Sequence, residues 1–481
     1  MDVVPLIRSW AFGTGPMYTR LAQAMRSAIE RGELPGGTRL PPERPLAEAL
    51  EVSRTTVVLA YHRLREQGLV ESRQGSGTWV PRRAAASSLF EERGRSFLVD
   101  SLTRAAAEEQ TDTIGFMAAC LPGAGVPLDE EWRAAEADVA ELASGAGYSP
   151  QGWPALRRAL AADFERRGLP TTPDEILVTN GAQQAIDLVA RLLVTRNESV
   201  VLEDPSYLGA IDAFTLAGAR LLPVPVGATG ADVGALRRVV TRTPPALVYL
   251  VPTFHNPTGS VMPESHRREV ARLSEETSVT VVEDESLAEL SFGAEPPPPI
   301  ARYAPRASIL TVGSMSKLFW GGLRVGWVRG PRPLIARLTR IKVVADLGGS
   351  VLSQALATRL LARREEVARK RRHESRRRYE RLAERLREAL PEWSWTEPSG
   401  GLTVWVRLPT PSAHELARVA PRHGVSIVPG PVHSPSHGHA DRVRLPFVLD
   451  EGLLGEAIAR LARAWEACRH PAPDRRVGVI V

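Results

Sequence analysis

The chain has 481 residues, of which 43% are hydrophobic and 24% charged, with a formal net charge of +6. This length predicts more than one domain, and these fractions are typical of a globular protein and exclude wholesale disorder. No stretch approaches the ~18 consecutive apolar residues of a membrane span, and residues 1–10 do not resemble a signal peptide. We therefore expect a cytoplasmic protein with no membrane partner. The two cysteines exclude a disulfide framework.

The first zone of the chain, residues 12–81, predicts three helices followed by a β-hairpin. Apolar residues recur at helical spacing in the first helix, and the hydroxyl of Ser53 can cap the third helix by accepting from the amides of its first turn. The expected elements are the helices Met17–Glu30 and Pro45–Leu50, a third helix from Ser53 to Gln67, and the strands Leu69–Ser72 and Gly77–Val80.

A short helix, a tight turn and a longer helix with a polar start form the pattern of a helix-turn-helix. The second helix of that motif presents its N-terminal residues to base edges in the major groove. Arg54 can fork onto a guanine. A small helical oligomerisation module is the alternative, because composition does not decide between the two. The zone resembles the winged-helix domain of the GntR family. On that resemblance the contacts with double-stranded DNA are Arg44, Arg54, Thr55, Thr56, Gly75, Gly77 and Thr78.

The rest of the chain divides into an expected linker, residues 82–113, and a large domain, residues 114–470. The linker is rich in Ala, Ser, Arg and Glu. In the large domain, helical patterns alternate with short β-branched runs, which predicts the α/β class with a largely parallel, doubly wound sheet. Ligands of such sheets bind beyond the carboxyl ends of the strands. The runs are Ile176–Thr179, Ser199–Leu202, Ala246–Leu250, Val279–Val282 and Ser308–Val312.

The residues that follow these five runs suit one cofactor, pyridoxal 5′-phosphate. They are a small-residue turn that opens a helix at 180–185, then Tyr207, Asn256, Asp284 and Lys317. The cofactor needs amides for its phosphate, an aromatic side chain against its ring and a donor for its phenolate oxygen. It also needs a carboxylate for its ring nitrogen and a lysine for its aldehyde. Taken singly, each residue also has a purely structural explanation, as a cap, a turn or a core residue.

Lysine chemistry is easy to place, because only three lysines occur: Lys317, Lys342 and Lys370. Lys317 follows a predicted strand in a Ser-rich loop. Lys342 and Lys370 lie in helical, arginine-rich segments, where we expect them to be solvated or to snorkel to the surface.

Residues 114–470 resemble fold type I pyridoxal-phosphate enzymes of the aspartate aminotransferase class, which implies the sheet described above and a small α+β subdomain. On that resemblance Lys317 is the catalytic residue that forms the Schiff base. Asp284 pairs with the pyridine nitrogen, Asn256 contacts the phenolate oxygen, and Tyr207 stacks on the ring. The implied phosphate ligands are Gly181, Ala182, Gln183, Ser314, Ser316 and Arg324. Arg444 stands where the family binds a substrate carboxylate, and Tyr148 stands where a neighbouring subunit closes the site.

Three further features have a weaker bearing on function. Ser286 stands where close relatives usually have Tyr, two residues after the aspartate, which leaves more of the phenolate contact to Asn256 and disfavours efficient transamination. Three histidines, His433, His437 and His439, could bind a metal, but we interpret them as part of a polar loop and expect no metal. The basic segment 363–381 predicts an exposed surface helix, with a second electrostatic contact to DNA as the alternative.

A GntR-like DNA reader joined to an aminotransferase-like domain is the architecture of the MocR subfamily of bacterial transcriptional regulators, which nearly the whole chain resembles. The resemblance implies a transcription factor that depends on pyridoxal phosphate and senses an amino compound or the cofactor itself. It also implies a homodimer on operators with repeated half-sites. Two alternatives stay open: a working aminotransferase with an accessory DNA-binding domain, and a DNA-binding scaffold whose cofactor site does not function.

Overall fold

The computed structural model describes residues 16–30, 34, 38–66, 69–73, 77–80, 112–123, 127–293, 295–409 and 413–469. The chain divides into two compact units, residues 1–96 and 97–481. Among the helices of these described ranges, none combines the length and the apolar character needed to cross a membrane.

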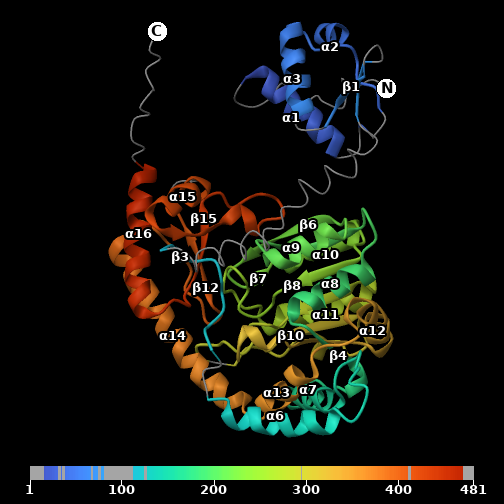
Figure 1. Cartoon of the computed structure of the whole chain (residues 1–481), viewed down its shortest axis with the longest axis vertical. Helices are drawn as coiled ribbons and strands as arrows, with labels where there is room; N and C mark the ends of the chain where they lie inside the picture. Colours follow the sequence, from blue (N-terminus) through green and yellow to red (C-terminus); the bar gives the residue numbers. More distant parts are fainter. Residues whose placement is uncertain are drawn as a thin grey trace. The chain divides into compact units, whose positions relative to one another are not determined.

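The N-terminal unit is a three-helix cluster with a small β-wing (Figure 1). Its elements are α1 (Met17–Glu30), α2 (Glu43–Ala49), α3 (Arg54–Glu66), β1 (Glu71–Arg73) and β2 (Gly77–Trp79). An isolated bridge between Arg39 and Trp79 adds a third segment to the hairpin. The three helices and the hairpin confirm the predicted elements, with shifts of a few residues at their ends. Gly75, a predicted DNA contact, lies outside the described residues.

The second unit is built on an eight-stranded sheet with the order β4-β11-β10-β9-β8-β5-β6-β7. Five neighbouring strands, β10 to β6 in that order, run parallel, whereas β11 and β7 are antiparallel to their neighbours. The predicted α/β class and all five predicted strands are confirmed; β6, β7 and β11 were not predicted. The bounds are β4 (Ile176–Thr179), β5 (Ser199–Asp204), β6 (Arg220–Gly227), β7 (Gly230–Ala231), β8 (Leu247–Leu250), β9 (Thr280–Asp284), β10 (Ile309–Ser314) and β11 (Gly326–Arg329).

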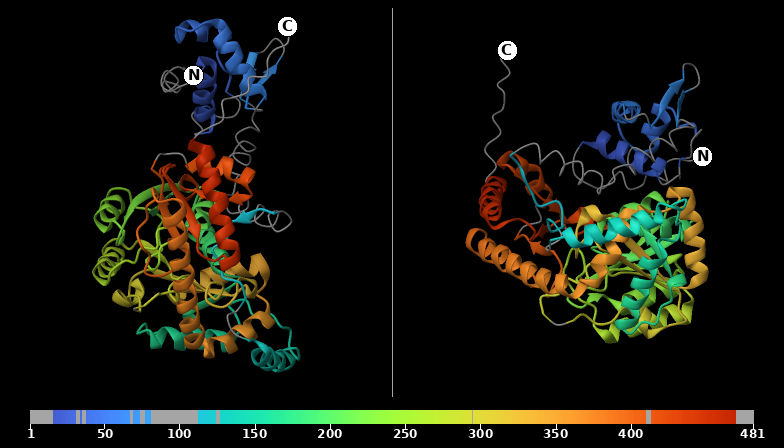
Figure 2. Two further views of the ribbon diagram at one scale, coloured as in Figure 1. Left: turned by 90° about the vertical axis from the view of Figure 1, so that its left-hand side faces the viewer. Right: turned by 60° about the horizontal axis from the view of Figure 1, so that its bottom comes forward.

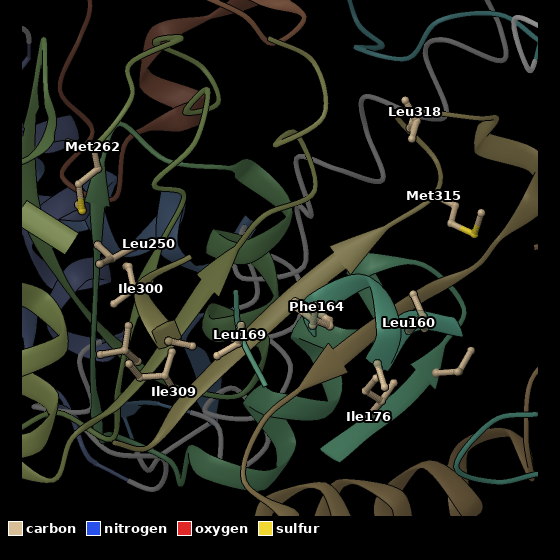
Figure 3. Packing of buried hydrophobic residues seen from close by; sticks show 14 of the residues in the cluster. Leu160, Phe164, Leu169, Ile176, Leu250, Met262, Ile300, Ile309, Met315 and Leu318 are labelled. Carbon is tan, nitrogen blue, oxygen red and sulfur yellow. The ribbon is translucent and has the colours of Figure 1, made fainter. Parts of the chain in front are cut away.

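Helices cover both faces of this sheet, and the strands alternate their side chains between the two layers. Along β4, Ile176 and Val178 face one apolar cluster and Leu177 faces the other. Figure 3 shows part of the first cluster, including Phe164, Ile176 and Ile309. The helices of the first face are α7 (Pro154–Arg166), α10 (Val233–Arg242), α11 (Glu264–Thr277) and α13 (Val351–Ala362), and those of the second are α8 (Ala182–Leu193), α9 (Leu208–Leu216) and α12 (Arg332–Asp346). A further helix, α6 (Asp129–Leu142), packs on α13.

A smaller α+β subdomain completes the second unit. Its antiparallel sheet has the order β12-β15-β14, and Figure 2 shows α14 and α16 running side by side against it. The strand β3 enters from the start of the unit and pairs with β13. The bounds are β3 (Ile114–Gly115), α14 (Arg364–Ala389), β12 (Thr403–Arg407), α15 (Ala413–Val419), β13 (Val425–Ser426), β14 (Val428–Pro429), β15 (Arg442–Pro446) and α16 (Glu451–Arg469).

Two expectations about basic side chains need correction. The basic segment is α14, but one face of that helix is buried: Arg371 is only 1% exposed and donates to the carbonyls of Leu318 and Phe319. Lys342 was expected to be solvated or to snorkel to the surface, yet it is 1% exposed and pairs with Asp346. A helical, arginine-rich context does not by itself expose a lysine, because a single nearby carboxylate can compensate its burial.

Candidate functional site

A cavity of about 140 Å³ lies beyond the carboxyl ends of the parallel strands. Each predicted strand end contributes to it, because parallel strands bring their carboxyl ends to one edge of the sheet. Leu402 and Thr403 of the smaller subdomain close one side. The predicted site residues that line the cavity are Ala182, Gln183, Tyr207, Asn256, Asp284, Ser314, Ser316, Lys317 and Arg324.

Lys317 lies three residues beyond β10 and is partly buried. Its Nζ donates a 2.7 Å hydrogen bond to the carbonyl of Ala119. Burial lowers the pKa of Lys317, and the cations of Arg444 and Arg324 act in the same direction. A lysine with a lowered pKa has a larger neutral fraction, which is the nucleophilic form of an amine.

Asp284 ends β9 and is 5% exposed. Its Oδ2 accepts a 2.8 Å hydrogen bond from the hydroxyl of Tyr249, and its Oδ1 accepts from the amide of Ser286 at 2.9 Å. Burial raises the pKa of Asp284, while these donors and the Lys317 cation oppose the rise. The carboxylate therefore suits a positively charged partner in the cavity.

Tyr207 occupies the N-cap position of α9 and lines the cavity. Its hydroxyl donates to Gln183 Oε1 at 3.0 Å, and Gln183 Nε2 donates to the carbonyl of Gly209 at 2.8 Å. The side chain of Gln183 is thus used to hold Tyr207. Any contact of Gln183 with a phosphate falls to its backbone amide, at the N-terminal turn of α8.

The turn before α8 approaches its neighbours closely. Gly181 has φ +83°, and a Cβ on it would lie 2.9 Å from Arg324 Nη2. Arg324 donates to the carbonyl of Asn180 at 2.7 Å. A Cβ on Gly326 would lie 2.6 Å from the carbonyl carbon of Gly181. The turn therefore requires glycine at both positions, and it brings helix amides and a guanidinium to one place, as a phosphate requires.

Asn256 and Ser286 both line the cavity. The buried Oδ1 of Asn256 has no hydrogen-bond partner within the described ranges, so this acceptor is open to a donor on a ligand. Ser286 lines the same cavity, at the position where the resemblance to the family led us to expect the longer side chain of a tyrosine.

Arg444 and Tyr148 do not line this cavity. Arg444, on β15, is 4% exposed and donates through Nη2 to the carbonyl of Met117. Burial lowers its pKa to about 10. Tyr148 is 72% exposed. A tyrosine this exposed has room to contact another molecule.

The segment around residues 116–121 is the part of the site that sequence reasoning missed. The carbonyls of Met117 and Ala119 accept from Arg444 and Lys317. Backbone carbonyls carry no sequence signal, and β3, which anchors this segment beside β13, has only two residues. No pattern in the sequence could have placed it there.

The three histidines after β14 do not gather around one point. His433 is buried and its Nδ1 lies 3.2 Å from the carbonyl of Ser206. His439 Nε2 lies 3.1 Å from Asp204 Oδ1, and His437 is exposed. In the part of the chain that the structure covers, no cluster of three or more metal-binding side chains occurs.

The N-terminal unit exposes the start of α3. Ser53 Oγ accepts from the amide of Thr56 at 3.1 Å, as predicted for a cap. Arg54 and Thr55 are exposed, and Arg54 pairs with Glu43 at 3.1 Å. Thr78 is half-buried on the wing, and Gly77 has φ +94°. Arg44 is exposed and pairs with Glu48. The predicted DNA contacts within the described residues thus lie on α2, α3 and the wing.

Comparison with known proteins agrees with both units. Residues 118–461 match the aminotransferase class I and II family, and residues 17–80 match the GntR family of bacterial regulatory proteins. The chain is 30% identical over 471 residues to the HTH-type transcriptional regulator YdfD of Bacillus subtilis, covering 93% of this chain and 97% of the relative. It is 32% identical over 360 residues to the probable rhizopine catabolism regulatory protein MocR of Rhizobium meliloti, covering 71% and 70%.

This chain belongs to the MocR subfamily of GntR-type regulators. The second unit of this MocR-type chain also resembles solved aminotransferases. One is the α-aminoadipate aminotransferase LysN of Thermus thermophilus, in complex with N-(5′-phosphopyridoxyl)-L-leucine. Its TM-score is 0.70 at 34% identity, over 75% of this chain and 94% of LysN. The predicted fold type I domain is confirmed, and its cofactor is pyridoxal phosphate. The GntR domain of this MocR-type chain implies DNA binding.

The residues of the cavity fit that cofactor. The side-chain amide of Asn256, the close glycine turn at Gly181, the buried carboxylate of Asp284 and the amine of Lys317 supply the polar groups that its ring, phosphate and aldehyde require.

Proposed function

We propose that this protein is a transcriptional regulator that binds pyridoxal phosphate at Lys317 and changes its affinity for DNA in response to an amino compound or to the cofactor itself. The observation that carries the proposal is the presence, in one chain, of a GntR-type unit and a cavity lined by Tyr207, Asn256, Asp284 and Lys317, the residue types that the cofactor requires. We assign the DNA-binding domain to residues 12–81, the linker to 82–113 and the cofactor domain to 114–470.

Pyridoxal phosphate supplies an aldehyde that reacts with primary amines and a ring that withdraws electrons. In our assignment Lys317 holds the cofactor covalently, and Asp284 keeps the ring nitrogen protonated. Asn256 binds the phenolate oxygen and Tyr207 packs on the ring. The phosphate is bound by the turn at Gly181, the amides of Ala182 and Gln183, the hydroxyls of Ser314 and Ser316, and Arg324.

An amino compound would compete with Lys317 for the cofactor. Arg444 would bind its carboxylate, because a guanidinium binds a carboxylate through two hydrogen bonds, and the buried Nε of Arg444 has no partner among the residues described. Such an effector changes DNA affinity only if it binds two arrangements of the protein with different free energies.

We further propose that the regulator acts as a homodimer. Tyr148 is 72% exposed and Leu347 is 52% exposed. The two residues belong to neighbouring loops, because a Cβ on Gly348, next to Leu347, would lie 3.1 Å from the carbonyl oxygen of Ser149, next to Tyr148. Val344, on α12 just before it, is 89% exposed. Such exposed apolar side chains suit an interface, and Tyr148 would then close the cofactor site of the partner. The two DNA-binding domains of one dimer fit operators with repeated half-sites.

A gel-shift titration tests this proposal. DNA fragments would first be selected from a random-sequence pool by the purified full-length protein. The affinity for a selected fragment would then be measured for the cofactor-free protein, the loaded protein, and the loaded protein with a panel of amino acids and amines. We expect the affinity to change with the cofactor or with one amine. An affinity that is the same in every state would rule out the regulatory proposal.

A second candidate function is transamination. It is favoured by the 37% identity over 327 residues to the 2-aminoadipate transaminase of Thermus thermophilus, covering 66% of this chain and 81% of that enzyme. Ser286 disfavours it, because its short side chain leaves Asn256 as the main phenolate ligand. Steady turnover of an amino acid with a keto acid would support this second function, and its absence with a broad panel would exclude it.

A further inference from the structure

Asp346, the last residue of α12, is the centre of a polar network next to the cofactor cavity. Its carboxylate accepts from Lys342 Nζ at 2.6 and 2.7 Å, from Asn180 Nδ2 at 2.9 Å, and from Gln184 Nε2 at 2.8 Å. The amide of Gly348 donates to it at 2.9 Å. None of these residues lines the cavity, and Asp346 and Lys342 were not singled out as site residues from the sequence.

The ion pair between Lys342 and Asp346 is not explained by a gain in the stability of the fold. The side chain of Lys342 is 1% exposed and that of Asp346 18%, and such a pair contributes little net stability because the charges lose most of their hydration. Burial opposes ionisation of Asp346, but the hydrogen bonds from Lys342 and Gln184 outweigh it and lower the pKa of the carboxyl. The carboxylate is therefore charged at neutral pH. The arrangement is better explained if Asp346 positions the residues that donate hydrogen bonds to it than if it stabilises the fold.

The network holds Asn180 from three sides. Its side-chain Nδ2 donates to Asp346, and its backbone N–H donates to Gln184 Oε1 at 2.8 Å. Its backbone carbonyl accepts from Arg324 Nη2 at 2.7 Å. Asn180 precedes Gly181, the N-cap residue of α8. The position of Asn180 therefore determines where the first amides of α8 and the guanidinium of Arg324 lie.

The turn after α12, which contains Gly348 and Gly349, lies close to the loop that carries the exposed Tyr148. A Cβ on Gly348 would lie 3.1 Å from the carbonyl oxygen of Ser149. Gln354 accepts from the amide of Trp153 at 2.7 Å and donates to the carbonyl of Gly349 at 3.1 Å. Asp346 thus links the turn at the start of α8 to the loop that follows Tyr148.

We propose that Asp346, with its buried counter-ion Lys342, is a positioning residue for the phosphate group of the cofactor: it fixes the turn at Asn180 and Gly181 so that the amides of α8 and Arg324 converge on that phosphate. This inference rests on the assignment of the phosphate to that turn.

The test compares pyridoxal phosphate with pyridoxal, which lacks the phosphate, on the full-length cofactor-free protein. Binding would be followed by absorbance, with folding checked by circular dichroism. For Asp346→Asn we expect the dissociation constant for pyridoxal phosphate to rise about tenfold, the loss expected for a hydrogen bond to a charged group. The dissociation constant for pyridoxal should stay within about twofold. The matched control is Asp187→Asn, which alters a half-exposed carboxylate of α8 that pairs with Arg191 at 2.9 Å.

An equal loss for both ligands, or no loss for either, would overturn the proposal, because a phosphate-positioning residue must discriminate between them. If Asp346→Asn does not fold, Gln184→Met removes both the donor to Asp346 and the acceptor for the backbone amide of Asn180, and leaves the ion pair intact. It should show the same selective loss, and a loss that is not selective would again contradict the proposal. If wild-type protein does not prefer pyridoxal phosphate to pyridoxal, the phosphate assignment itself is wrong, and the role of Asp346 is wrong with it.

Discussion

The hydroxyl of Tyr249 donates a 2.8 Å hydrogen bond to Asp284, and both side chains are buried. Tyr249 lies on β8 and Asp284 on the adjacent β9. The tyrosine therefore acts on the carboxylate from behind the cavity. Because it donates to the charged form of Asp284, it opposes the rise in pKa that burial causes.

Tyr249→Phe should raise the pKa of Asp284 further, because the charged form loses a donor. As the pH falls, the protonated aspartic acid no longer pairs with the protonated ring of the cofactor. Loss of cofactor affinity on acidification should therefore begin at a higher pH in the variant, by about one pH unit for a hydrogen bond to a charged group. The measurement is the dissociation constant of pyridoxal phosphate across the range from mildly acidic to neutral pH.

Tyr303→Phe is the matched control for this prediction. It also removes a tyrosine hydroxyl, but one that has no hydrogen-bond partner in the described ranges. Its affinity for pyridoxal phosphate should fall at the same acidic pH as that of the wild type. Superimposable profiles for all three proteins would show that Tyr249 does not tune Asp284.

Gly181→Ala should weaken cofactor binding by displacing Arg324. The added Cβ would lie 2.9 Å from Arg324 Nη2, and the backbone conformation of φ 83° and ψ 171° costs an alanine about 1–3 kcal/mol. The measurement is the dissociation constant of pyridoxal phosphate, together with the gain in melting temperature that the cofactor produces.

Gly230→Ala separates backbone strain from the effect on the site. Gly230 also has φ +83°, but its nearest atom would be Met262 Cβ at 3.4 Å, an ordinary contact. This variant should lose a similar amount of stability and keep its cofactor affinity. If both variants bind the cofactor alike, the close approach of Gly181 and Arg324 does not matter for the site.

Arg54→Ala should cost ~1–3 kcal/mol of specific DNA binding if the guanidinium reads a base. Arg54 is exposed at the start of α3, where a recognition helix meets base edges. Arg63→Ala, near the other end of the same helix, should have a much smaller effect. Gel-shift titration on a selected fragment checks both, and undiminished binding by Arg54→Ala would contradict its assignment as a DNA contact.

Much of the site follows from strand ends. The strands before Asn180, Asp284 and Lys317 are short β-branched runs with clear ends, so the sequence predicts where their carboxyl ends lie. Because these strands run in the same direction, their carboxyl ends meet at one edge of the sheet. The cap at Ser53 followed in the same way from local hydrogen bonding.

What could not be predicted depends on tertiary contacts. The carbonyl of Ala119 reaches Lys317 across 198 positions of the chain, and a backbone group leaves no mark on the sequence. The prediction for Lys342 was wrong for a similar reason. Its burial is compensated by Asp346 one helical turn away, and nothing in an arginine-rich helix indicates which cation faces inward.

The central claim is that Lys317 carries the cofactor in this DNA-binding chain. Its most direct test is to load the full-length protein with pyridoxal phosphate, reduce it with borohydride, digest it and map the modified peptide by mass spectrometry. We expect a phosphopyridoxyl group on Lys317 and none in Lys317→Ala. Labelling of Lys342 or Lys370 in its place, or an adduct that persists in Lys317→Ala, would contradict the claim.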